Sequence, residues 1–102
     1  MRLSVSNLAW PATYDLEVAR VLRTAGVDAI DVAPGRYFED PASAAEADAT
    51  RVRDWWERRG AEIVGLQSLL FGAGALNLFG PEPMREAMLA RLSSTCRLAG
   101  WL

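Results

Sequence analysis

The feature that most limits what this chain can fold into is an alternation of short apolar segments with longer amphipathic ones. Leu3–Asn7, Ala29–Val32 and Glu62–Gln67 suit β-strands, and the last two are nearly continuous apolar runs, as in strands that a sheet buries on both faces. A segment with helical periodicity follows each of them. The order β-α-β-α-β-α predicts an α/β fold with a parallel sheet and right-handed crossovers.

The three segments with helical periodicity are Tyr14–Ala25, Ala42–Arg59 and Pro83–Ala99. A glycine follows each segment, and glycine best accepts the left-handed conformation found just past a helix C-terminus. These residues are Gly26, Gly60 and Gly100. The sequence therefore predicts that each helix ends at its glycine.

Three details of the helices follow from residue type. Asp40 and Pro41 are placed to be the N-cap and first residue of the second helix. Of the adjacent Trp55 and Trp56, we expect one to face the sheet and the other to lie at the rim. Cys96 falls in the apolar stripe of the third helix, where we expect a buried thiol.

The unit of helix, glycine and strand recurs faintly along the chain. Copies begin at Gly26 and Gly60, and a third begins at Gly100, close to the last residue, Leu102. The spacing is near the average for an eight-unit barrel, a little over ~30 residues per unit. We therefore expect residues 1–102 to be the N-terminal three βα units of a (β/α)8 barrel domain, truncated before strand 4.

Charge and composition exclude several functions. The net charge is −2, so we expect no nucleic-acid partner. All 11 basic residues are arginine, which leaves no lysine or histidine for a Schiff base, a P-loop, a general base or a metal ligand. The segment Ile63–Pro81 lacks charge, but its glycines and polar residues argue against a membrane span. One cysteine and no secretory signal predict a cytoplasmic protein.

Three stretches together resemble the sugar phosphate isomerase/epimerase family, within the xylose-isomerase-like TIM barrel superfamily. They are Leu3–Trp10 (LSVSNLAW), Gly26–Pro34 (GVDAIDVAP), and Gln67–Gly72 with Leu76–Phe79 (QSLLFG and LNLF). They match the first three strands and their loops, which is the N-terminal third of a family member. Many relatives carry Glu where this chain has Asp31, so its carboxylate would reach less far.

The resemblance implies a metal-dependent barrel that acts on sugars or sugar phosphates. The family's principal metal ligands lie on later strands, so we expect a divalent metal in the intact protein but none bound wholly within this chain. We accordingly expect the 102 residues alone to be inactive.

The candidate substrate contacts lie where the predicted strands end, because a parallel barrel carries its site there. They are Asn7, Trp10, Asp31, Arg36, Gln67 and Ser68. Asp31 is the strongest, since a carboxylate among apolar neighbours is costly unless it has a partner. Three structural alternatives stay open: Asn7 holds a loop, Trp10 packs the barrel mouth, and Asp31 pairs with an arginine such as Arg36.

A non-catalytic function is the alternative. Three βα units cannot close a barrel, so an exposed sheet edge is expected, and an open edge favours pairing with another chain. The chain would then be a small α/β module for assembly or binding, and would form a homo-oligomer through that edge.

Overall fold

A computed structural model describes all residues, Met1–Leu102. It has one three-stranded sheet in the order β1-β2-β3, in which both neighbouring pairs are parallel. The strands are β1 (Ser4–Ser6), β2 (Ala29–Val32) and β3 (Glu62–Leu66). The predicted α/β class with a parallel sheet is thus confirmed.

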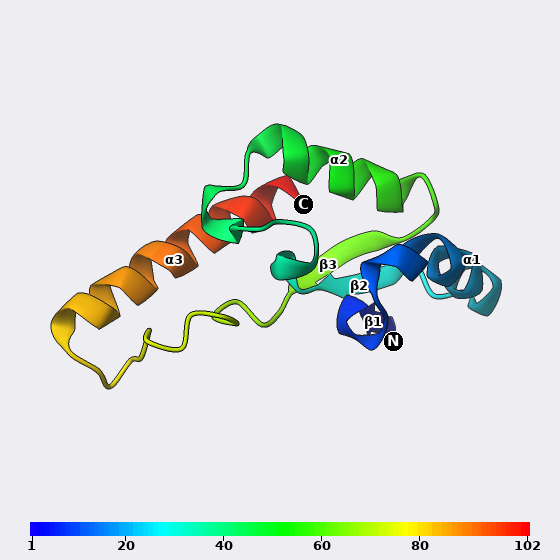
Figure 1. The fold of residues 1–102 in the computed structure, drawn as a ribbon. Helices are drawn as coiled ribbons and strands as arrows, with labels where there is room; N and C mark the ends of the chain where they lie inside the picture. The colour runs from blue at the N-terminus through cyan, green and yellow to red at the C-terminus, as the bar shows by residue number, and fades with distance from the viewer.

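Three helices accompany the sheet: α1 (Asp15–Ala25), α2 (Glu46–Glu57) and α3 (Glu82–Trp101). Figure 1 shows α2 lying along one side of the sheet and α3 projecting from the body of the molecule. The inner end of α3 packs against α2 and a short 3-10 turn, Pro41–Ser43. No helix is long and apolar enough to cross a membrane.

The main core lies between the sheet and the first two helices. Ile30 and Val32 of β2 are fully buried there, against Ala19 and Leu22 of α1 and Trp56 of α2. Side chains alternate along a strand, so Ala29 and Asp31 point to the opposite face. The helices therefore cover one face of the sheet only.

Because one face of the sheet is uncovered, the expectation that β3 is buried on both faces is wrong. This strand is not buried on both faces: Glu62 and Val64 are exposed, and only Ile63 and Leu66 pack toward the helices. The apolar run is interrupted because Val64 is an extra residue in the pairing, with Ile30 opposite Ile63 and Asp31 opposite Gly65. Such a bulge redirects the side chains on either side of it.

The predicted helix ends agree with the structure at two glycines and differ at the third. Gly26 (φ 71°) and Gly60 (φ 87°) adopt positive φ after α1 and α2. Gly100 was expected to end α3, but the helix runs through it to Trp101. The buried side of α3 is Met88, Thr95 and Leu98, which leaves Cys96 exposed rather than buried.

The start of the second helix was also predicted wrongly. Asp40 does cap Pro41–Ser43, accepting from the Ala42 amide (3.1 Å) and the Ser43 hydroxyl (2.8 Å), but this is an isolated 3-10 turn. These two hydrogen bonds, the Ser43 one foremost, lower the pKa of the Asp40 carboxyl. The chain then becomes extended at Ala44 and Ala45, and α2 begins at Glu46.

The close approach of Gly65 to Asp31 gives a testable prediction. A Cβ at position 65 would collide with the Asp31 carboxylate, so Gly65→Ala should lower the free energy of unfolding by about 1–2 kcal/mol in urea denaturation. Gly35→Ala is the control, because nothing lies near a Cβ there. In an Asp31→Ala background the cost should vanish; an equal cost in both backgrounds would contradict the contact.

Candidate functional site

The open face of the sheet carries a polar cluster at its centre. The Ser4 hydroxyl on β1 donates to Oδ2 of Asp31 on β2, and Gly65 of β3 leaves room for the other carboxylate oxygen. The register places Ser6 beside Asp31 across the β1–β2 pair. A partly exposed carboxylate is therefore held beside the small residues Ser4, Ser6 and Gly65.

Gln67 extends this cluster toward the carboxyl end of the sheet. Its backbone amide donates to the Val32 carbonyl (2.9 Å), which continues the β3 ladder. Its side-chain amide nitrogen donates to Ser6 Oγ and approaches the Asp31 carbonyl (3.4 Å). Ser68 follows with φ 56°, the one positive φ outside glycine, so the chain turns sharply after Gln67.

Arg2 lies at the amino ends of the strands on the same face. Its guanidinium donates to Asp28 (3.0 Å) and to Glu62 (2.7 Å), so that it bridges the starts of β2 and β3. The Glu62 hydrogen bond, followed by that to Asp28, raises the pKa of Arg2. All three side chains are about half exposed, so these pairs add little stability, but they keep this face polar.

Asn7 and Trp10 lie away from this cluster. Asn7 is buried, and its Oδ1 accepts from the Ala33 amide (2.8 Å), which ties the end of β1 to the end of β2. Trp10 is also buried and donates from Nε1 to Asp15 Oδ1 (2.7 Å). Both side chains therefore have partners within the fold, and their contact with a substrate stays a prediction.

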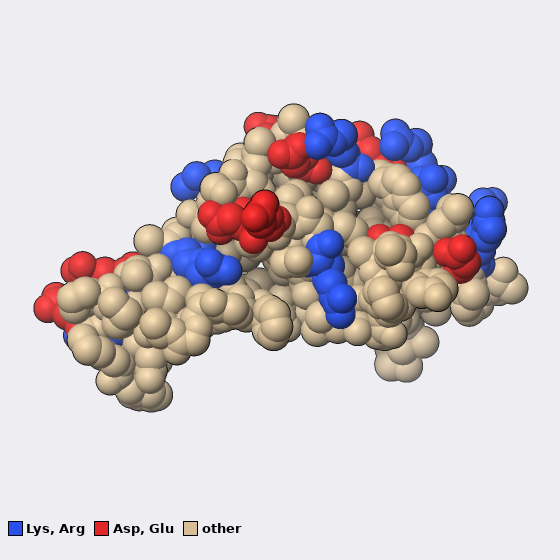
Figure 2. Space-filling model, viewed as in Figure 1, with Lys and Arg blue, Asp and Glu red and all other residues tan.

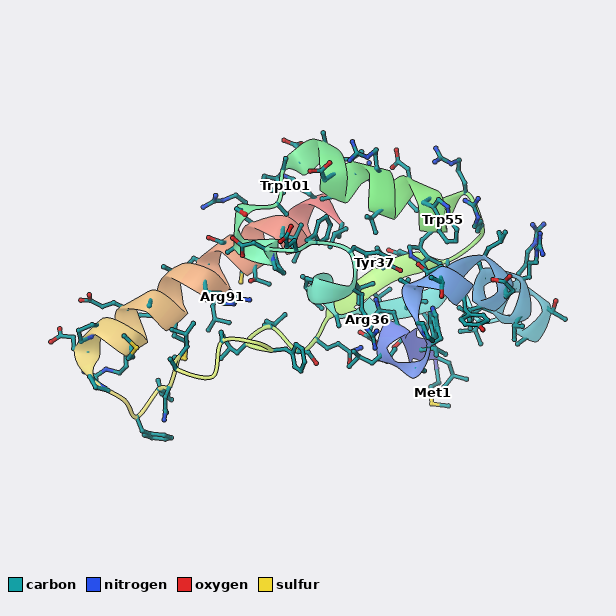
Figure 3. The ribbon with its side chains drawn as sticks, in the orientation of Figure 1. Met1, Arg36, Tyr37, Trp55, Arg91 and Trp101 are labelled. Atoms are coloured by element: carbon teal, nitrogen blue, oxygen red, sulfur yellow. The ribbon has the colours of Figure 1, made fainter.

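Asp31 and Arg36 are not paired with each other. Asp31 takes part in no ion pair, and its side-chain partner is the Ser4 hydroxyl, so the proposed arginine pair is wrong. Arg36 is exposed and has no ion-pair partner. It extends beside the end of the sheet (Figure 3).

A hydrogen-bonded network lies on the helix side of the sheet. The Tyr37 hydroxyl donates to Asp15 Oδ2 (2.8 Å) and accepts from Trp56 Nε1 (3.0 Å). The other oxygen of Asp15, Oδ1, accepts a hydrogen bond from the Trp10 indole N–H. Burial, and then the hydrogen bond to Asp15, raises the pKa of Tyr37 well above its ordinary value. The network joins α1, α2 and the segment after β2.

Three residues of this network, Asp15, Tyr37 and Trp56, line a cleft of about 570 Å³ between the segment Tyr37–Ala44 and α2. Its lining includes four carboxylates, one guanidinium and the two adjacent tryptophans. These residues are Asp15, Glu39, Asp40, Asp48, Arg51, Trp55 and Trp56. Trp56 is fully buried while Trp55 lies at the rim, as predicted.

Sequence reasoning missed Ser4, Gly65, Asp15 and Tyr37. Ser4 could have been found, because Ser4 and Ser6 alternate on one face of β1, opposite Val5. Gly65 could not, since its importance depends on a bulge that no local pattern indicates. Asp15 and Tyr37 are far apart in sequence and are brought together only by folding.

The residues present do not suffice for a metal centre. No three cysteine or carboxylate side chains lie in an arrangement that could hold a metal ion, and the open face offers one carboxylate, Asp31, with the amide of Gln67. Divalent cations of the magnesium or manganese type require more oxygen ligands than these two. We therefore derive no chemical step through a metal.

Comparisons with family models, with curated proteins and with solved structures find no match to this chain.

The network on the helix side predicts a specific loss of stability. Tyr37→Phe removes a hydroxyl that serves Asp15 and the buried Trp56 N–H, so it should lower the free energy of unfolding by about 1–3 kcal/mol. Tyr14→Phe is the matched control, because Tyr14 is exposed and its hydroxyl has no partner; it should change stability by less than about 0.5 kcal/mol. Equal effects of the two changes in urea denaturation would refute the role of the network.

The raised pKa of Tyr37 predicts how the folding stability depends on pH. The folded state holds the neutral phenol, so its stabilising effect is complete below the unfolded pKa of ~10 and is lost as pH rises above it. In a Tyr14→Phe background, absorbance at 295 nm should show Tyr37 ionising only together with unfolding. Ionisation near pH 10 in the folded chain would be the opposite result.

Proposed function

We propose that this chain forms the first three βα units of a metal-dependent sugar or sugar phosphate isomerase or epimerase with a (β/α)8 barrel. The observation that carries the proposal is the polar cluster on the uncovered face of the parallel sheet. In a barrel that face points inward, and the carboxyl ends of the strands form the active end. Asp31 and Gln67 lie on that face, toward that end.

The cluster has the chemistry to hold a polyhydroxylated molecule. Asp31 has one oxygen engaged by Ser4 and further lone pairs for sugar hydroxyls. Gln67 offers an amide that both donates and accepts, and Ser68 follows it at the turn. The exposed, unpaired Arg36 would meet a phosphate or carboxylate group. Asn7 would act indirectly by joining the ends of β1 and β2, and Trp10 by packing in the core and bonding to Asp15.

The division of labour follows from what the chain contains. Isomerisation next to a carbonyl needs a base and a group that polarises the substrate oxygens. We place the metal ligands and the catalytic carboxylates on strands beyond Leu102, so these 102 residues would supply pocket wall and polar contacts. The partner is a small molecule, not nucleic acid or membrane.

A non-catalytic assembly module is the second candidate, and one observation favours it. β1 and β3 each pair only with β2, so both edges of the sheet are free. Two large apolar side chains are exposed at these edges: Leu3, just before β1, and Val64 in β3. A second copy could pair along an edge. On size-exclusion chromatography, a clean folded monomer or a discrete, well-folded edge-paired oligomer would argue for a self-sufficient module, whereas open-ended aggregates would argue for a truncated barrel.

The enzyme proposal is tested on the product of the reading frame extended beyond Leu102. That frame should encode carboxylates at later strand ends, and the product should interconvert sugar or sugar phosphate isomers when supplied with Mg²⁺, Mn²⁺ or Co²⁺. Asp31→Asn should reduce kcat/KM about 10- to 100-fold, the usual cost of losing a charged hydrogen bond. Glu86→Gln, on the exposed side of α3, is the control and should have little effect. A stop codon directly after Leu102, or an Asp31 variant with full activity, would contradict the proposal.

A further inference from the structure

The cleft between the segment Tyr37–Ala44 and α2 lies on the helix side of the sheet, apart from the polar cluster around Asp31. Its volume, about 570 Å³, is within the range of small-molecule sites. Figure 2 shows acidic side chains gathered where this segment meets α2 and α3. The cleft therefore has the size of a binding site and a strong charge bias of its own.

The negative charge in the cleft is only partly neutralised. Arg51, the one basic residue in its lining, is already paired with Asp48, and Arg91 lies near enough to Asp40 to help lower its pKa. Glu39 is exposed and has no cation partner. Asp15 accepts only from the neutral Tyr37 and Trp10. Two carboxylates thus face the cleft without a counter-ion.

The aromatic wall adds a second, independent attraction for cations. The guanidinium of Arg59 lies 3.8 Å from the centre of the Trp55 ring, so this indole already binds a cation on one side. Trp55 also lines the cleft and packs edge-on against Trp56, with ring centres 4.9 Å apart. Figure 3 shows Tyr37 reaching toward α2, on which Trp55 lies. Carboxylates and electron-rich rings together favour an organic cation over a metal ion.

We propose that this cleft binds a small aliphatic amine, with its ammonium groups held by the Glu39 and Asp15 carboxylates and its methylene chain lying against Trp55. A diamine suits the lining best, because the carboxylates sit on different parts of it: Asp15 begins α1, and Glu39 lies in the segment before α2. The hydrocarbon between two ammonium groups would cover apolar surface that Trp55 and Val52 leave half exposed.

The test is a titration of the 102-residue chain with butane-1,4-diamine at neutral pH and low ionic strength, followed by amide NMR shifts. Saturable shifts confined to residues 37–56 and to the residues around Asp15 are expected, and they should weaken as salt is added. Butane-1,4-diol has nearly the same shape without the charge and should leave the shifts unchanged. Shifts with the diol that equal those with the diamine, or shifts that never saturate, would overturn the proposal.

Substitutions at three exposed residues test whether charge in the cleft controls the affinity for the diamine. Glu39→Gln should weaken diamine binding about three- to tenfold, and Arg51→Gln should tighten it by a similar factor because it frees Asp48. Glu17→Gln on α1, outside the cleft, is the control and should leave affinity unchanged. If Glu17→Gln weakened binding as much as Glu39→Gln, the effect would be one of overall charge and the site would be rejected. Asp31→Asn should not alter diamine binding, so failure of the sugar proposal and failure of this one are distinguishable.

Discussion

The packing of the helices against the sheet depends on one residue, Trp56. It is fully buried, which requires a partner for its N–H, and that partner is the Tyr37 hydroxyl. Tyr37 in turn donates to Asp15, and Asp15 also accepts from Trp10. One chain of hydrogen bonds thus joins both helices that cover the sheet to the segment after β2. Asp15, Tyr37 and Trp56 also line the acidic cleft, so the same hydrogen bonds support the core packing and the proposed binding site.

The sequence predicted the elements well where local pattern decides them. The α/β order, the parallel sheet, and the turns at Gly26 and Gly60 follow from apolar periodicity and from the conformational freedom of glycine. Prediction failed where long-range packing decides. Gly100 stays helical as α3 runs on to Trp101, and the 3-10 turn at Pro41 is separated from α2 by an extended link.

The candidate site was predictable only in part. Asp31 stood out because it is a carboxylate inside an apolar strand, and the structure places it on the uncovered face beside Ser4 and Gly65. That face carries polar side chains at its centre and at both ends, from Arg2 through Asp31 to Gln67, although the small, fully buried Ala29 also lies on it. A polar face suits water or a hydroxylated ligand better than a packed apolar interior. The opposite chemistry of the two faces is therefore the basis of the functional proposal.

The most direct measurement of this two-faced sheet compares the thiol reactivity of two neighbouring positions in β2. In a Cys96→Ser background, Ile30→Cys places a thiol on the face that α1 and α2 cover, and Asp31→Cys places one on the open face. The account predicts that a thiol reagent modifies position 31 readily and position 30 only at the rate of unfolding. Equal rates at the two positions, or protection at position 31, would contradict an open polar face.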